Sequence, residues 1–206
     1  MAERQLRRRG IGDERVLAAM ASVPRELFVP ERLARRAYAD SALPIGDQQT
    51  ISQPWVVAAI CQALELGGGE RVLEVGTGSG YSTAILALLA ADVLSIERLA
   101  GLAADASDRL ERLGYGDRVE IRVGDGSLGA PGDAPFDAIA VHASAPAPPP
   151  GLLEQLAPGG RLVLPVAEPG ADLLVCLTRT ADGFDRRPIA PCRFVPLVGE
   201  HGFGER

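Results

Sequence analysis

The sequence contains no lysine and no asparagine, so arginine supplies all of its permanent positive charge. The missing lysine excludes Schiff-base chemistry and a lysine general base. A GC-rich genome accounts for both absences, because lysine and asparagine share AAN codons, and we attach no functional meaning to them. With 21 basic and 27 acidic residues the net charge is −6. No arginine-rich block offsets that charge, so we expect no nucleic acid as a partner.

Histidine and cysteine are scarce as well. His142 and His201 are the only histidines, too few for most catalytic metal sites, so we expect no metal. Cys61, Cys176 and Cys192 form no CxxC pair and leave an odd count, which disfavours a disulfide framework or a zinc site. Such cysteine usage is typical of a reducing compartment, and we expect a cytoplasmic protein. Cys61 falls on an apolar helix face and is expected in the core.

Long apolar runs are also missing. No run approaches the roughly 20 residues needed to span a bilayer, and the polar first ten residues lack the apolar core of a signal peptide, so we expect no membrane partner. The 206 residues, 47% hydrophobic and 23% charged, indicate one globular domain over 1–206, expected to be monomeric. Residues 1–53 are predicted to form a helical extension with a covering loop, and 54–206 a Rossmann-like core.

From residue 71 onward, short apolar segments alternate with helical ones. The pattern predicts strands over 71–75, 92–96, 119–123, 136–141, 161–165 and 172–179, and helices over 79–90, 99–113 and about 151–156. Before them, Asp13 is expected to cap a helix over 14–21, and Pro54 to open one that ends near 66. Residues 37–53 are expected to be irregular.

This alternation predicts the fold class. The strands are too apolar to be half exposed, which indicates an α/β protein with a single doubly wound, mostly parallel sheet covered on both faces. The last strands have no helices between them, so we expect an antiparallel strand pair over 184–198 at one edge of that sheet.

The strongest local signal is Val72-Leu-Glu-Val-Gly-Thr-Gly-Ser-Gly-Tyr81, where a strand ends, a glycine loop follows and a helix begins. Glycines let a ligand approach the backbone, and a helix N-terminus offers free N–H groups. A dinucleotide fingerprint would need glycine at position 81. Glu74 before the loop makes the segment similar to motif I of class I S-adenosylmethionine-dependent methyltransferases, whose acid orients the ligand's ammonium group, directly or through water. A glycine turn without a ligand is the alternative.

Two further acids stand at strand ends. Glu97 follows the second strand of the core, where a carboxylate can accept both ribose hydroxyls of a nucleotide. Asp125 follows the third strand, within Gly124-Asp-Gly126, and can accept from the amino group of adenine. Each also has a simpler interpretation, a solvated strand-end charge for Glu97 and a common Asp-Gly turn for Asp125. Beside the glycine loop, both favour a cofactor site.

The remainder of the chain resembles one family, the protein-L-isoaspartate (D-aspartate) O-methyltransferases. The resemblance covers nearly the whole chain, and its most family-specific part is Gln49-Thr-Ile-Ser-Gln-Pro54. It also includes Glu3–Leu6, Gly12–Leu17, Val23–Glu31, Ala37–Asp40, Leu43–Gly46, Val72–Tyr81, Gly124–Gly126, Phe136–Ile139, Pro158–Leu162, Leu164–Val166 and Arg193–Leu197. It implies transfer of a methyl group from S-adenosylmethionine to isoaspartyl residues of peptides and of unfolded or aged proteins. S-adenosylhomocysteine would be released, and repair would proceed through a succinimide.

The resemblance also assigns residues. It implies that Ser52 is the active-site serine beside the transferred methyl group, and spacing alone also allows Ser52 to cap the helix at Pro54, which is compatible with that role. The implied cofactor contacts are Gln49, Thr50, Ile51, Ser52, Glu74, Gly76, Thr77, Gly78, Gly80, Glu97, Asp125 and Gly126. The implied substrate contacts are Ile51, Ser52, Val195, Pro196 and Leu197.

His142 departs from the family pattern, because related sequences carry a small or hydroxyl residue at this strand end. We interpret it as a substrate contact, with a tolerated strand-end variant as the alternative. Two other functions stay open. One is a related carboxyl methyltransferase with a dedicated peptide or natural-product substrate, and the other is a cofactor-binding protein without transferase activity.

Overall fold

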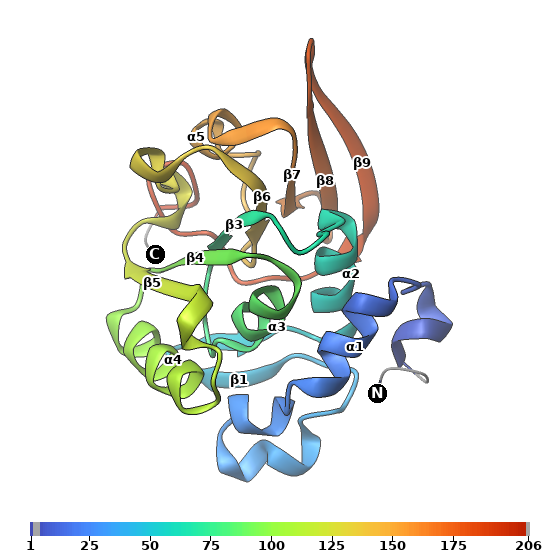
Figure 1. Ribbon diagram of the computed structural model, residues 1–206, viewed down its shortest axis with the longest axis vertical. Helices are drawn as coiled ribbons and strands as arrows, with labels where there is room; N and C mark the ends of the chain where they lie inside the picture. Colours follow the sequence, from blue (N-terminus) through green and yellow to red (C-terminus); the bar gives the residue numbers. More distant parts are fainter. Residues whose placement is uncertain (2–4, 205–206) are drawn as a thin grey trace.

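The computed structural model describes residues 1 and 5–204, and its centre is a seven-stranded sheet in the order β5-β4-β3-β6-β7-β8-β9 (Figure 1). Neighbouring strands from β5 to β7 run parallel, and β8 runs antiparallel to both β7 and β9. The strands are β3 (Arg71–Val75), β4 (Asp92–Glu97), β5 (Val119–Val123), β6 (Phe136–Val141), β7 (Leu156–Ala167), β8 (Asp172–Thr180) and β9 (Gly183–Cys192). The predicted doubly wound, mostly parallel sheet with an antiparallel edge is confirmed.

Helices cover both faces of the sheet. They are α1 (Glu14–Ser22), α2 (Pro54–Leu64), α3 (Tyr81–Leu89), α4 (Ala100–Arg112) and α5 (Pro150–Glu154). Buried side chains of α1, α2 and α3 form one core cluster with Val72, Val93 and Val163 of the sheet. The opposite face packs Leu73 and Ile139 against Leu152 of α5 in a second cluster. The two clusters hold the parallel strands in register, with their carboxyl ends at one edge.

The N-terminal extension is more ordered than predicted. Its helix α1 begins as expected, because the Asp13 carboxylate accepts from the backbone N–H groups of Arg15 and Val16. Residues 37–53, predicted to be irregular, contain a two-stranded antiparallel hairpin of β1 (Leu43–Gly46) and β2 (Gln49–Ile51). The 3₁₀ turns η3 (Arg25–Phe28) and η4 (Glu31–Arg36) join α1 to this hairpin. Glu3 and Arg4, at the start of the family resemblance, lie outside the described residues.

The predicted antiparallel strand pair at the edge of the sheet is confirmed, but its strands are β8 and β9 rather than two strands within 184–198. Of that range only the residues of β9 belong to the sheet, and β9 forms with β8 the long hairpin that projects from the molecule in Figure 1. After β9 the chain turns back across the carboxyl end of β6, because the Asp172 carboxylate accepts from the Phe194 N–H and Ser144 forms a parallel bridge with Pro196. The expectation that no strand is half exposed also fails for β5, an edge strand whose Val123 is 59% exposed.

Candidate functional site

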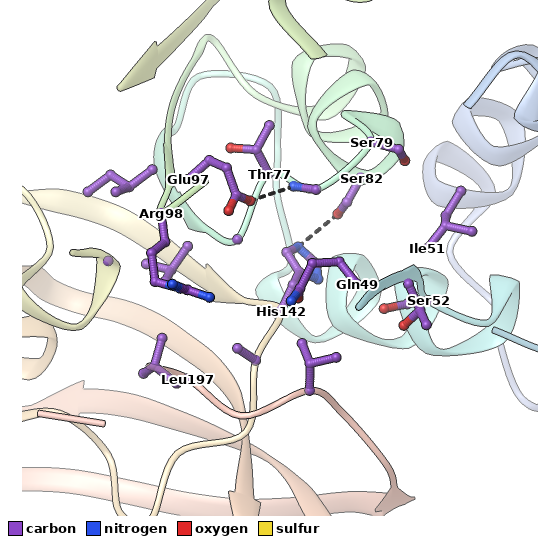
Figure 2. Close-up of a pocket in the computed structure, with 18 of the residues that line it drawn as sticks. Gln49, Ile51, Ser52, Thr77, Ser79, Ser82, Glu97, Arg98, His142 and Leu197 are labelled. Atoms are coloured by element: carbon purple, nitrogen blue, oxygen red, sulfur yellow. Dashed lines mark hydrogen bonds between the residues drawn. The ribbon is translucent and has the colours of Figure 1, made fainter. Parts of the chain in front are cut away.

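A cleft opens at the carboxyl ends of β3, β4 and β6 (Figure 2). The residues around it come from the β1–β2 hairpin, the glycine loop, the strand ends and the C-terminal segment. Those we predicted that line it are Gln49, Thr50, Ile51, Ser52, Gly76, Thr77, Gly78, Glu97, Gly126, His142, Val195, Pro196 and Leu197. The cleft is also lined by residues that were not predicted, among them Ser79, Tyr81, Ser82, Arg98 and Ala143.

The glycine loop and Glu97 form one wall of the cleft. Gly78 has a φ of 54°, which a residue with a side chain rarely adopts, and its N–H donates to Glu97 Oε2 at 2.9 Å. Glu97 Oε1 accepts from the Leu99 N–H at 3.0 Å. Each carboxylate oxygen therefore keeps a lone pair for a ligand. The helix predicted from residue 79 begins at Tyr81, because Gly80 takes the left-handed conformation as its N-cap.

Glu74 lies behind the wall of the cleft and is not among the residues that line it. Its side chain is completely buried, and its Oε2 accepts from Thr83 Oγ1 at 2.5 Å and from Ser95 Oγ at 2.6 Å. Ser95 Oγ is also 2.6 Å from the Oγ1 of Thr77, a residue that lines the cleft. Glu74 Oε1 has no hydrogen-bond partner among the described residues. A buried carboxylate oxygen without a hydrogen-bond donor is costly unless a polar or cationic group lies near it.

His142 fills the space between Glu74 and the cleft. Its Nε2 is 3.2 Å from Glu74 Oε1 and 2.9 Å from Ser82 Oγ, and Figure 2 shows the ring directed at Ser82. Gly76 is adjacent, since a Cβ on it would meet the His142 Cβ at 3.5 Å. The ring also lines a second groove, shared with Ser52 and Arg193, that continues outward from the cleft. His142 therefore stands where the two hollows meet.

Ser52 is held in the cleft through its backbone. Its carbonyl accepts from Arg25 Nη2 at 2.7 Å, and Arg25 Nε donates to the Ala37 carbonyl at 2.7 Å. The Arg25 guanidinium is fully buried 4.7 Å from the centre of the Tyr81 ring, and burial lowers its pKa. The cap of α2 is Gln53, without a side-chain hydrogen bond, so Ser52 is not the helix cap that its spacing allowed.

The structure does not bring every predicted residue to the cleft. Gly80 serves as the N-cap of α3 and is not among the lining residues. Asp125 lies in an adjacent hollow, where its carboxylate accepts from Ser127 and from the Glu200 N–H. Burial raises the pKa of Asp125, but these hydrogen bonds outweigh it and hold the pKa below its ordinary value. Gly126 does line the cleft, and a Cβ there would lie 2.4 Å from Val75 Cγ1, so no larger residue fits.

The C-terminal segment closes the cleft through residues that the sequence analysis missed. Ser144 exchanges backbone hydrogen bonds with Val195 and Leu197 at 2.8 and 2.7 Å. Its hydroxyl donates to Asp172 Oδ1, while Asp172 Oδ2 accepts from the Phe194 N–H. The sequence analysis placed Asp172 only as the first residue of a predicted strand. No local pattern indicated that its carboxylate would bind the backbone of Phe194, 22 residues away.

The described residues contain no group of three or more histidine, cysteine, aspartate or glutamate side chains that could hold a metal ion. Cys61, Cys176 and Cys192 are free thiols. Burial, and then the nearby Asp172, raises the pKa of Cys192 to about 11, so it is a thiol rather than a thiolate at neutral pH. Among the described residues, no helix combines the length and the hydropathy required to cross a bilayer.

Comparisons with known proteins agree with this geometry. The profile of the family described as protein-L-isoaspartate(D-aspartate) O-methyltransferase matches residues 2–202. A protein-L-isoaspartate O-methyltransferase 1 from Rhodopseudomonas palustris (strain HaA2) is 54% identical over 98% of this chain and 83% of its own length. A protein-L-isoaspartate O-methyltransferase from Methanoculleus marisnigri is 51% identical over 98% of this chain and 92% of its own.

Solved structures show the same similarity. A protein-L-isoaspartate O-methyltransferase superposes with a TM-score of 0.83 at 26% identity, over 95% of this chain and 64% of that chain. A Plasmodium falciparum protein described as a putative protein-L-isoaspartate O-methyltransferase, solved with S-adenosyl-L-homocysteine, superposes with a TM-score of 0.81 at 27% identity. That match covers 93% of this chain and 94% of the other.

The Arg25 contacts lead to a prediction about stability. Arg25→Met keeps most of the apolar volume but leaves the Ala37 and Ser52 carbonyls without their donors. We expect the free energy of unfolding to fall by about 2–4 kcal/mol in a urea melt. Arg36→Met, at an exposed arginine of η4, is the matched control and should change it by no more than about 0.5 kcal/mol. Equal losses for the two variants would contradict the role assigned to the buried guanidinium.

Proposed function

The chain belongs to the protein-L-isoaspartate(D-aspartate) O-methyltransferase family, and we propose that it transfers a methyl group from S-adenosylmethionine to the free α-carboxylate of L-isoaspartyl residues in damaged proteins. The observation that carries the proposal is the shared position of Ser52, the glycine loop and Glu97 around one cleft. The methyl ester would then lose methanol as the following backbone amide attacks it. A succinimide would form, and its hydrolysis away from the enzyme would return part of the damage to normal aspartate.

The residues around the cleft fit S-adenosylmethionine. When bound, this cofactor supplies a methyl group activated by a positively charged sulfonium. Glu97 would accept from the ribose hydroxyls, because both of its oxygens keep lone pairs after binding the Gly78 and Leu99 N–H groups. The buried Glu74 carboxylate supplies negative charge behind the glycine loop and behind His142, on the side of the cleft where the ammonium group would lie. Asp125 is engaged by Ser127 and Glu200, so we propose for it a supporting position beside Gly126.

The remaining chemistry is alignment. A carboxylate with a pKa of about 4 is already ionised at pH 7, so it needs neither a general base nor a metal to become a nucleophile. We propose that the Ser52 hydroxyl donates to this carboxylate and holds one oxygen in line with the methyl group. Ile51 and the 195–197 segment would enclose the isoaspartyl side chain. Alignment of two reactants in this way supplies on the order of 7–11 kcal/mol.

The groove beyond Ser52 supports a polypeptide substrate. It extends the cleft outward between Trp55 of α2 and Phe194 of the C-terminal segment, so the chain on either side of the isoaspartyl residue could lie in it. An extended chain fits such a groove more readily than a folded one, and we therefore propose unfolded or aged proteins as substrates. We propose further that the enzyme acts as a monomer in the cytoplasm, where its free thiols would stay reduced.

A pair of peptides tests the function. The two peptides are identical except that one contains L-isoaspartate and the other L-aspartate, and methyl transfer from labelled S-adenosylmethionine is measured for each. We expect transfer to the isoaspartyl peptide alone, unchanged by EDTA because no step requires a metal. Equal transfer to both peptides, or activity that EDTA abolishes and a divalent ion restores, would overturn the proposal. A requirement for one particular sequence would favour a dedicated peptide substrate.

Ser52→Ala tests the proposed carboxylate donor. Loss of a hydrogen bond to a charged group costs about 1.5–3 kcal/mol, which corresponds to a rate about ten- to a hundredfold lower. We expect this loss in single-turnover methylation, with little change in the urea midpoint, since the Ser52 side chain caps no helix. Ser107→Ala, on α4 outside the cleft, is the control. An unchanged rate with a lowered midpoint would show a structural role instead.

Glu97→Ala separates cofactor binding from chemistry. Glu97 would contact the ribose, away from the reacting carbon, so the ground state and the transition state should lose similar stabilisation. We expect the dissociation constant for S-adenosylmethionine, measured by calorimetry, to rise by about tenfold or more. The single-turnover rate at saturation should change much less. A large fall in that rate with unchanged affinity would be the contrary result.

A further inference from the structure

His142 separates the buried acid of motif I from the cleft. The Glu74 side chain is 0% exposed and borders no part of the cleft, whereas the His142 side chain is 7% exposed and lines it. The distance of 3.2 Å between His142 Nε2 and Glu74 Oε1 leaves no room for a water molecule between the two atoms. The imidazole ring therefore lies between the Glu74 carboxylate and an amino group that a ligand would place in the cleft.

The neighbours of Nε2 decide where its proton lies. A neutral imidazole carries one proton, on either Nδ1 or Nε2. With the proton on Nδ1, the Nε2 lone pair would face the Glu74 carboxylate, and Glu74 Oε1 would remain buried without a donor. With the proton on Nε2, that N–H donates to Ser82 Oγ and places its partial positive charge 3.2 Å from Glu74 Oε1, which stabilises the buried charge. The surroundings thus favour the second tautomer, whose other nitrogen is an acceptor.

Nδ1 is the nitrogen left for a ligand. It has no hydrogen-bond partner among the described residues, and its ring lines the cleft above Gly76. Glu74 Oε2 is already engaged by Thr83 and Ser95, so the carboxylate is held in place on its far side. The Glu74 carboxylate on the other side of the ring increases the basicity of the Nδ1 lone pair. Such an acceptor binds a cationic donor rather than an anion.

We propose that His142 is the residue that binds the amino group of the methionine moiety, accepting a hydrogen bond at Nδ1, with Glu74 as the positioning residue that holds its proton at Nε2. The inference rests on the proposed function and refines it. His142 was interpreted from the sequence as a substrate contact, and this proposal assigns its ring to the cofactor instead. A small or hydroxyl residue at this position would leave the task to Glu74 and a water molecule.

Equilibrium binding tests the proposal without turnover. Calorimetry would compare three ligands: S-adenosylhomocysteine, an analogue that lacks only the amino group, and an analogue that lacks only the carboxylate. His142→Phe keeps a ring but no nitrogen. We expect it to weaken the binding of S-adenosylhomocysteine and of the decarboxylated analogue about ten- to a hundredfold. Binding of the deaminated analogue should be unchanged. His142→Leu repeats the measurement if the Phe variant does not fold, and His201→Ala, at the exposed second histidine, is the control.

A double-mutant cycle with Glu74→Gln adds an independent readout. Because Glu74 would act through His142, the two effects should not add. The double variant should bind S-adenosylhomocysteine no more than about twofold more weakly than the weaker-binding single variant. Additive effects, or a His142→Phe penalty that disappears with the decarboxylated rather than the deaminated analogue, would overturn the proposal. If the unmodified protein bound no S-adenosylhomocysteine at all, the proposed function itself would fail. If it bound this ligand and His142→Phe did not change the affinity, only the role proposed for His142 would fail.

Discussion

The carboxylate of Glu74 connects the elements that build the cleft. It lies at the end of β3 and accepts from Thr83 of α3 and Ser95 of β4, while His142 approaches it from the end of β6. A completely buried carboxylate is costly unless donors surround it, so these elements are constrained to meet at one point. The glycine loop runs between the same elements, and its path depends on that junction. The positions of the glycine loop and of Glu97, which binds the Gly78 N–H, depend on this junction.

Arg25 performs a comparable role for the N-terminal extension. Its guanidinium reaches the carbonyls of Ala37 and Ser52 and lies over Tyr81 at the start of α3. Carbonyl oxygens and an aromatic ring stabilise a cation without the geometric demands of a carboxylate partner. The extension is therefore part of the site rather than an addition to it, because the backbone that presents Ser52 is anchored from η3.

Local patterns predicted the part of the site that lies on regular elements. The strand ends, the glycine loop and Glu97 could be located because apolar strands and glycines alternate at short spacing. Arg25, Ser144 and Asp172 gave no such signal, since each binds backbone groups more than ten residues away. The turn after β9 was missed for the same reason. It depends on the Asp172 carboxylate, which accepts from the Phe194 N–H just after β9 ends. Asp125 was expected at the ligand, but its Oδ1 accepts from Ser127 and its Oδ2 from Glu200, in a C-terminal segment whose course the sequence did not reveal.

The projecting hairpin has a consequence if the protein meets unfolded chains as the proposed substrates. Its outer strand β9 is the open edge of the sheet, and unpaired edge strands invite any extended polypeptide to add itself as a further strand. Pro188 and Pro191 remove N–H groups from this edge, and the exposed Arg186 and Arg187 place charge beside them. The opposite edge is only five residues long, and its Arg122 is paired with Glu120 and Asp133. Both edges thus discourage co-aggregation with the damaged proteins that the cleft would admit.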